Sequence, residues 1–234
     1  MKVSTAIILA GGLGTRLRST VPDLPKPMAP INGRPFLEYL MDKWINQGVT
    51  HFILSVGYLS EIIRDHFGEQ YRNASVSYAI EESPLGTGGG LLMAAYDLRE
   101  SFLVLNGDTF FEVDLDKLVQ YHKIRNSEWT FSLFRTNESK RYMEVNVDKE
   151  GVIHPLSQRS EQSYFLVNGG VYLMNPSVLN RLSYQRGSVA SLEDQILPEY
   201  RASGGVVYGM ECPGKFIDIG VPEDYRNATG IIVT

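Results

Sequence analysis

Short apolar runs alternate with helical segments along the first half of the chain, and this alternation limits the possible folds more than any other feature. Strands are expected at 3–9, 51–56, 75–80 and 102–105, and helices at 35–45, 60–67 and 90–98. Strand–helix–strand units of this kind build a parallel sheet with helices on both faces. The sequence therefore predicts an α/β, Rossmann-like fold.

The second half of the chain has a more mixed pattern. Expected helices at 114–126, 191–200 and 222–228 are separated by expected strands at 130–134, 142–148, 164–174, 206–210 and 215–219. Asp148-Lys149-Glu150-Gly151 is a hairpin turn signal, and Ser191 is the expected cap of the helix that follows it. We expect a mixed, mainly parallel sheet flanked by helices, in a single domain over residues 1–234.

Two polar segments directly follow expected strands. The first strand ends at Gly11-Gly12, and the fourth ends at Asn106-Gly107-Asp108. Ligands of open α/β sheets bind beyond the carboxyl ends of the strands. We therefore expect both segments at one rim of the sheet, close to a ligand.

The charge of the chain indicates the class of ligand. The whole chain has 22 Lys and Arg against 27 Asp and Glu, a net charge of −5, which argues against a nucleic-acid partner. Residues 1–34 carry five basic side chains and one acidic one, which favours a small anionic ligand. The single cysteine, Cys212, excludes a disulfide framework. Because no membrane span or secretory signal is recognised, we expect a cytoplasmic protein without a membrane partner.

The segment Leu9–Leu17 is a glycine-rich exit from the first strand. Glycines let backbone N–H groups approach phosphate oxygens closely. The segment lacks the third glycine of the dinucleotide fingerprint and the Gly-Lys-Ser/Thr of the P-loop. It is thus a candidate phosphate loop of neither common type, and a flexible turn is the alternative interpretation.

Three charged side chains are candidates for phosphate and metal chemistry. Lys26 lies between Pro25 and Pro27, which restrict its backbone; a solvated loop lysine is the alternative. Asp108 follows a buried strand, where a carboxylate can bind Mg²⁺ or can cap the next turn. Asp218 lies inside an apolar strand, where an unpaired carboxylate is costly unless it is paired or bound to a metal.

Five segments, in this order, resemble the sugar-1-phosphate nucleotidylyltransferase family: Leu9–Leu17, Pro25–Met28, Pro84–Gly90, Asn106–Asp108 and Phe216–Tyr225. Each motif is modest alone, but together they span essentially the whole chain. Within the family, the segments 80–89 and 216–225 most resemble the D-glycero-D-manno-heptose 1-phosphate guanylyltransferases. The resemblance implies a glycosyltransferase-A-like nucleotidyltransferase fold without the left-handed β-helix tail of some relatives. It also implies that the N-terminal half binds the nucleotide and the C-terminal half the sugar phosphate.

The chemistry that the resemblance implies needs no covalent enzyme nucleophile. An oxygen of the sugar 1-phosphate attacks the α-phosphorus of a nucleoside triphosphate, and pyrophosphate leaves. Lys26 is expected to span the α-phosphate and the sugar phosphate, and Arg16 to hold the leaving pyrophosphate. Asp108 and Asp218 are expected to bind the cofactor, Mg²⁺.

The resemblance also assigns residues to the two substrates, GTP and the sugar 1-phosphate. The expected nucleotide-binding residues are Leu9, Ala10, Gly11, Gly12, Gly14, Thr15, Glu81, Gly86, Thr87 and Asp108. The expected sugar-phosphate-binding residues are Gly107, Arg159, Asn168, Gly169 and Glu193. A carboxylate can accept both N–H groups on the Watson–Crick edge of guanine, so Glu81 or Glu82 is a candidate for base recognition; solvated strand-end charges are the alternative.

Two departures from the family pattern concern the acceptor side. Tyr142-Met143 stands where relatives commonly have Tyr-Gly, and Arg159 ends a segment where relatives have Phe-x-Glu-Lys.

The resemblance predicts GDP-heptose synthesis, as for capsule or surface polysaccharides. The alternatives are a mannose-1-phosphate guanylyltransferase, an enzyme that uses UTP or dTTP, and a non-catalytic nucleotide-sugar sensor. A homodimer is a possible assembly.

Overall fold

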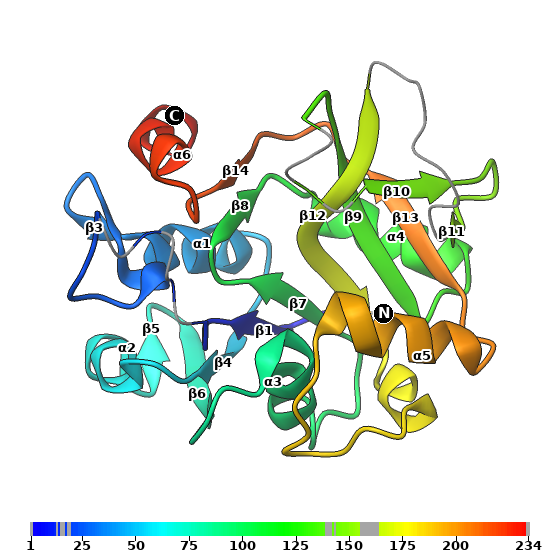
Figure 1. Ribbon diagram of the computed structural model, residues 1–234, viewed down its shortest axis with the longest axis horizontal. Helices are drawn as coiled ribbons and strands as arrows, with labels where there is room; N and C mark the ends of the chain where they lie inside the picture. The colour runs from blue at the N-terminus through cyan, green and yellow to red at the C-terminus, as the bar shows by residue number, and fades with distance from the viewer. Residues whose placement is uncertain are drawn as a thin grey trace.

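The computed structural model describes residues 2–12, 14, 17, 20–138, 142, 144–154 and 164–232. Within these residues, ten strands form one sheet in the order β11–β10–β12–β7–β1–β4–β6–β5, with β9 beside β12 and β13 beside β9 (Figure 1). Its strands are β1 (Thr5–Leu9), β4 (His51–Val56), β5 (Gln70–Tyr71), β6 (Ala74–Ile80), β7 (Phe102–Asn106), β9 (Trp129–Thr136), β10 (Glu144–Val147), β11 (Ile153–His154), β12 (Phe165–Met174) and β13 (Val207–Glu211).

The centre of the sheet is parallel. β1 pairs in parallel with β4 on one side and with β7 on the other, and β4 pairs in parallel with β6. The sheet then becomes mixed, because β12 runs antiparallel to β7, β9 and β10. The predicted α/β fold, with a mixed and mainly parallel sheet flanked by helices, is confirmed.

Two further pairs of short strands lie outside this sheet. β8 (Thr109–Phe111) pairs with β14 (Phe216–Asp218), and β2 (Pro30–Ile31) pairs with β3 (Arg34–Pro35), both antiparallel. The helices are η1 (Lys26–Met28), α1 (Phe36–Ile45), α2 (Ser60–Phe67), α3 (Gly86–Ala94), α4 (Leu115–Ile124), η2 (Pro176–Arg181), η3 (Leu192–Ile196), α5 (Leu197–Ala202), α6 (Pro222–Asn227) and α7 (Thr229–Ile232).

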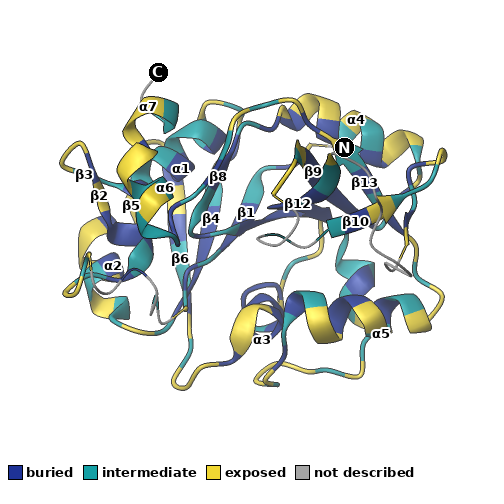
Figure 2. Ribbon diagram, turned by 45° about the horizontal axis from the view of Figure 1, so that its top comes forward, coloured by how far each residue is buried: buried dark blue, intermediate teal, exposed yellow. Residues whose placement is uncertain are grey.

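Helices cover both faces of the sheet. Successive strand residues point to opposite faces, so Ile8 packs in the core cluster under α1, α2 and α4, and Ile7 in the cluster under α3 and α5. Figure 2 shows α1 and α4 on one side of the sheet, and α3 and α5 on the other. The buried apolar runs predicted as strands are therefore central strands with a helix layer on each side.

Two predicted helices have wrong bounds, and the first is α3. A helix was expected over 90–98, but α3 runs Gly86–Ala94 because a distant segment completes its first turn. The N–H groups of Gly88 and Gly89 donate to the carbonyl of Ala190, at 2.8 and 3.1 Å. A Cβ at Gly89 would lie 2.4 Å from the carbonyl oxygen of Ser188, so only glycine permits this contact.

The helix expected over 191–200 is also corrected, since a π-helical turn, η3, precedes the shorter helix α5. The cap is confirmed: the Ser191 hydroxyl accepts from the Asp194 N–H at 3.1 Å. The hairpin turn is confirmed as well, because Asp148 and Gly151 close the turn between β10 and β11. The sequence patterns miss β2, β3, β5, β8, β11, η1, η2 and α7, which are all short.

Candidate active site

The carboxyl ends of three central strands lie level with one another. Leu9 of β1 is paired with Ser55 of β4 on one side and with Asn106 of β7 on the other. The N–H of Gly107 donates to the Leu9 carbonyl at 2.9 Å, and the N–H of Ala10 donates to the Ser55 carbonyl at 2.8 Å. The predicted common rim is confirmed, and the backbone there is close-packed.

Two adjoining cavities open at this rim. The first, about 260 Å³, is lined by Leu9, Gly11, Gly12, Ser55, Glu81, Pro84, Gly86, Thr87, Asn106 and Asp108. The second, about 220 Å³, is lined by Leu9, Ala10, Gly12, Gly14, Leu17, Lys26, Pro27, Gly107, Asp108 and Gly220. Leu9, Gly12 and Asp108 belong to both, so the two cavities form one trough. Every described residue in the predicted nucleotide set lines this trough.

Lys26 brings together the two predicted metal ligands. Its Nζ forms an ion pair with Asp108, and lies 3.8 Å from Oδ1 of Asp218. β14 places Asp218 opposite Thr109 of β8, and the N–H of Ile219 donates to the Asp108 carbonyl at 3.0 Å. The structure therefore brings residues 108 and 218 together beside Lys26, although 110 positions separate the two carboxylates in the sequence.

The donor set suits a hard divalent cation. Within the described residues, no group of three or more His, Cys, Asp or Glu side chains could hold a metal ion. Mg²⁺, however, needs only one or two protein carboxylates when substrate phosphates complete its coordination. In this structure the positive charge next to both carboxylates is the Lys26 ammonium. Asp108 and Asp218 therefore fit Mg²⁺ in chemical type and in their demand for positive charge.

Glu81 is a fixed acceptor inside the trough. The Ser55 hydroxyl donates to its Oε1 at 3.0 Å, and the N–H of Leu85 donates to its Oε2 at 2.9 Å. A Cβ at Gly11 would lie 2.4 Å from Oε1, so the glycine rim packs directly on this carboxylate. Glu82 is exposed and lines a different cavity. Of the two glutamates left open by the sequence, Glu81 is the one that faces the trough.

Glu193 belongs to a hydrogen-bond network beside Thr87. The Tyr172 hydroxyl donates to Oε1 of Glu193 at 3.0 Å, and the Thr87 hydroxyl lies 3.4 Å from Oε2. The Asn168 amide donates to the Tyr172 hydroxyl at 2.7 Å. Gly169 packs against the Phe111 ring. The network links the nucleotide side of the site to the residues predicted for the sugar.

Tyr172 and Ser55 are two hydrogen-bonding residues of this site that sequence reasoning missed. Tyr172 reads as a core aromatic, and its ring does pack on Phe131. Strand alternation places residues 168, 170 and 172 on one face, and this was the available signal. In the run Phe52–Val56, Ser55 is the one polar side chain among apolar ones.

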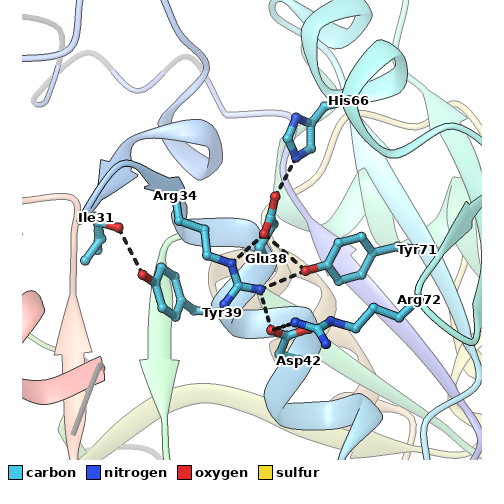
Figure 3. Close-up of polar contacts among 8 residues, drawn as sticks. All are labelled: Ile31, Arg34, Glu38, Tyr39, Asp42, His66, Tyr71 and Arg72. Carbon is cyan, nitrogen blue, oxygen red and sulfur yellow. Dashed lines mark hydrogen bonds and ion pairs between the residues drawn. The ribbon is translucent and has the colours of Figure 1, made fainter.

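The β2–β3 hairpin follows Lys26 in the chain, and a cluster of charged side chains around Arg34 holds it in place. Figure 3 shows Arg34 of β3 bound to Glu38 and Asp42 of α1 and to Tyr71, with a 2.8 Å hydrogen bond to the Tyr71 hydroxyl. Its guanidinium also stacks 4.5 Å above the Tyr39 ring. His66 contacts Oε1 of Glu38, and Arg72 contacts both carboxylate oxygens of Asp42. This cluster ties the β2–β3 hairpin to α1, α2 and β5.

The hairpin is also held from the C-terminal side. The Tyr225 hydroxyl of α6 donates to the Pro30 carbonyl at 2.6 Å, and Thr229 of α7 contacts Asn32 at 3.3 Å.

Three of the predicted site residues, Thr15, Arg16 and Arg159, lie outside the described residues, as does Met143.

A family model described as "Nucleotidyl transferase" matches residues 5–233. The chain belongs to the nucleotidyl transferase family. The match to the family model spans every element that builds the trough, from β1 to α7. The predicted family and the prediction of a transferase are therefore confirmed.

Two curated relatives of this nucleotidyl transferase carry the same name, D-glycero-alpha-D-manno-heptose 1-phosphate guanylyltransferase. The protein of Campylobacter jejuni subsp. jejuni serotype O:2 is 39% identical over 222 residues, which are 94% of this chain and 96% of that protein. The protein of Aneurinibacillus thermoaerophilus is 40% identical over 224 residues, which are 95% of this chain and 96% of that one.

A solved structure shares the fold as well. The crystal structure of HddC from Yersinia pseudotuberculosis complexed with GMP-PN has a TM-score of 0.84 and 34% identity, and the match covers 97% of this chain and 99% of that chain. Within the described part of the nucleotidyl transferase, no helix has the length and apolar character to cross a membrane. The cytoplasmic location and the homodimer stay predictions.

Proposed function

We propose that this nucleotidyl transferase transfers GMP from GTP to D-glycero-α-D-manno-heptose 1-phosphate, giving GDP-heptose and pyrophosphate. The two relatives with this name match nearly the full length of the chain and of their own sequences. The observation that carries the proposal is the meeting of Lys26, Asp108 and Asp218 beside the trough at the strand ends. This arrangement gathers charge where two phosphorylated substrates would have to meet.

The reaction requires positioning and charge neutralisation. An oxygen of the sugar 1-phosphate forms a bond to the α-phosphorus of GTP, and the bond from that phosphorus to the β-phosphate oxygen breaks, so pyrophosphate leaves with the electron pair. Like-charged phosphates repel each other, and the Lys26 ammonium is placed to offset this repulsion. Backbone N–H groups of Gly11, Gly12 and Gly14 are proposed to hold phosphate oxygens.

Asp108 and Asp218 are proposed to hold Mg²⁺. When bound, the ion would neutralise charge on the phosphates. In the free protein Lys26 is the cation that the two carboxylates share. An ammonium is a compact charge with three donors and little directional preference, so Lys26 can also bind phosphate oxygens when a substrate is present.

Glu81 is proposed to select guanine. Each of its carboxylate oxygens already accepts one hydrogen bond from the protein, which fixes the orientation of the group. Each oxygen keeps a further lone pair, so the carboxylate can accept the two adjacent N–H groups of guanine. Uracil and thymine do not present that pair of donors. Gly86 and Thr87, on the same cavity wall, are proposed to flank the base and the ribose.

The acceptor side is proposed to use Gly107, Asn168, Gly169 and Glu193, with Arg159 at the phosphate. Arg16 and Thr15 are proposed to contact the triphosphate. This division assigns the nucleotide to the N-terminal half of the domain and the sugar phosphate to the C-terminal half.

The proposal is tested by measuring pyrophosphate release with Mg²⁺ and a panel of GTP, ATP, UTP and dTTP against heptose, mannose and glucose 1-phosphates. We expect release with GTP and the heptose phosphate. Release with UTP but not GTP would refute the role of Glu81. Release with mannose 1-phosphate alone would refute the heptose assignment, and no release in any combination would refute the enzyme activity.

A further inference from the structure

Glu193 is held by side chains from two other elements, and the direction of each hydrogen bond can be worked out. Glu193 lies in the first turn of η3, Tyr172 comes from β12 and Thr87 from α3. The inference drawn from this network rests on the proposed role of Glu193 in binding the sugar.

The first chain of hydrogen bonds begins at a backbone N–H. The N–H of Gly170 donates to Oδ1 of Asn168 at 3.0 Å. A backbone N–H can only donate, so the amide oxygen of Asn168 faces Gly170 and the amide nitrogen faces Tyr172. That nitrogen donates to the Tyr172 hydroxyl at 2.7 Å, and the hydroxyl hydrogen is left for Glu193, 3.0 Å away.

The second chain also begins at a backbone N–H. The N–H of Leu192 donates to Oγ1 of Thr87 at 2.8 Å. The hydroxyl of Thr87 therefore accepts from Leu192, and its hydrogen is free for Oε2 of Glu193 at 3.4 Å. Both chains end on Glu193, which receives a donor on each oxygen.

We propose that Tyr172 is a positioning residue that fixes Glu193 as a pure hydrogen-bond acceptor for a hydroxyl group of the acceptor sugar. An ionised carboxylate that already faces two donors can offer a ligand only its remaining lone pairs. The site therefore selects a sugar with a free hydroxyl at that point over one whose hydroxyl is methylated or missing. The orientation of Glu193 is set before the sugar arrives, because Tyr172 is fully buried against Phe131.

The protonation of Glu193 and of Tyr172 depends on the same surroundings. Burial raises the pKa of Glu193 above its ordinary value and the neighbouring Asp194 adds to the rise, while the hydrogen bonds from Tyr172 and Thr87 limit it. Burial also raises the pKa of Tyr172 well above its ordinary value, so this phenol keeps its proton and remains a donor at neutral pH. The two donors thus oppose the effect of burial on the carboxylate.

The test compares Tyr172→Phe with Tyr200→Phe in steady-state kinetics. Tyr200 is a matched control, since it is also fully buried and its hydroxyl donates to another carboxylate, Glu128, at 2.9 Å. In Tyr172→Phe we expect the KM for the sugar 1-phosphate to rise about tenfold, the effect of losing one hydrogen bond to a charged group. The KM for GTP and kcat should stay within about twofold. Thermal melting of both variants shows whether each is folded.

A double-mutant cycle shows whether Tyr172 acts through Glu193. If it does, Tyr172→Phe adds nothing to the rise in KM of Glu193→Gln, and the two effects are not additive. Additive effects, or equal changes in Tyr172→Phe and Tyr200→Phe, would overturn the positioning role. The wild-type panel identifies the sugar phosphate used in these assays. An active wild type with an unchanged Tyr172→Phe refutes only this inference, whereas an inactive wild type refutes the proposed function and the inference with it.

Discussion

The proposed phosphate side and the proposed sugar side of the site hold their carboxylates in different ways. On the phosphate side, Asp108 and Asp218 share one ammonium, Lys26, and the Asp108 side chain is 36% exposed. On the sugar side, Glu193 receives hydroxyl donors whose direction is set by backbone N–H groups, and Tyr172 is fully buried. Ion pairs depend mainly on distance, whereas hydrogen bonds depend on direction as well.

This difference has a chemical reason. On the proposed phosphate side the total charge would change as a triphosphate binds and pyrophosphate leaves, so partners that can be exchanged would be useful there. On the proposed sugar side the ligand would be recognised by the positions of its hydroxyl groups, for which a fixed acceptor would be useful. Four experiments can distinguish charge sharing at Lys26 from directional hydrogen bonding at Glu193, and can test the elements that support both.

Removing one charge on the phosphate side should have the largest effect. In Asp108→Asn we expect turnover to fall by at least about a hundredfold, because a preorganised charge in the site is lost. Pyrophosphate release measures the loss, and an unchanged melting temperature shows that the fold is intact. Asp97→Asn, a change of an exposed carboxylate outside the trough, serves as the control and should keep the full rate. Full turnover of Asp108→Asn would refute the proposed metal role.

A displacement of α3 should weaken the binding of both proposed substrates, because this helix supplies Gly86 and Thr87 to the trough and Thr87 also contacts Glu193. In Gly89→Ala the new methyl group would lie 2.4 Å from the Ser188 carbonyl, and overpacking of this kind typically costs about 1–3 kcal/mol. We expect KM to rise for GTP and for the sugar phosphate together, since α3 and η3 are displaced as a pair. Urea unfolding and kinetics measure the two effects. Gly230→Ala, where no atom lies within 4 Å of the new methyl group, should change neither.

Breaking the brace of the hairpin should mainly reduce stability. Arg34→Met removes the cation that Glu38 and Asp42 share, and the side chains of these carboxylates are 17% and 19% exposed. We expect the free energy of unfolding to fall by about 1–3 kcal/mol, measured in urea. Arg135→Met, which breaks a pair with Glu211 in which both side chains are about half exposed, should cost about 0.5 kcal/mol or less. Equal losses in the two variants would show that the brace is an ordinary surface network.

The smallest effect concerns pH. Burial raises the pKa of Glu38, but the hydrogen bonds from Arg34 and His66 outweigh it, so the folded pKa lies below the ordinary value of 4.5. The stability that this provides is present above pH 4.5 and is lost as the pH falls through the folded pKa. Arg34→Met should therefore lose less stability than the wild type as the pH falls from above 4.5 to below the folded pKa of Glu38. Parallel acid sensitivity in both proteins would contradict this account.

The strand ends and the charged cluster could be predicted from the sequence, because the signals for them are local. Apolar runs that end in glycine or aspartate predict strands that stop at a rim, and topology then brings Gly11 and Asp108 together. Asp218 could be predicted as a partnered carboxylate because it interrupts an apolar strand. That Lys26 would be the partner of both carboxylates could not be derived, since it depends on how β14 folds back onto β8.

Other features were hidden because distant contacts decide them. The start of α3 depends on the carbonyl of Ala190, and four nearby glycines disfavour a helix on local grounds. The choice between Glu81 and Glu82 depends on Ser55 from a neighbouring strand. Tyr172 resembles any core aromatic until the hydrogen bond to Glu193 is seen. Hydrophobic periodicity indicates which side chains are buried. Which partner a polar side-chain atom binds depends on tertiary contacts.

The contact between Tyr225 and Pro30 joins residues that are 195 positions apart. During synthesis, the N-terminal strands can pair long before α6 has left the ribosome, because domains emerge and fold from the N-terminus onward. The aspartate from β14 reaches Lys26 only with that last part of the chain. A polypeptide made only as far as β8 therefore has the parallel strands but an incomplete charge cluster, so we expect affinity for nucleotide to arise only after β14 has been added.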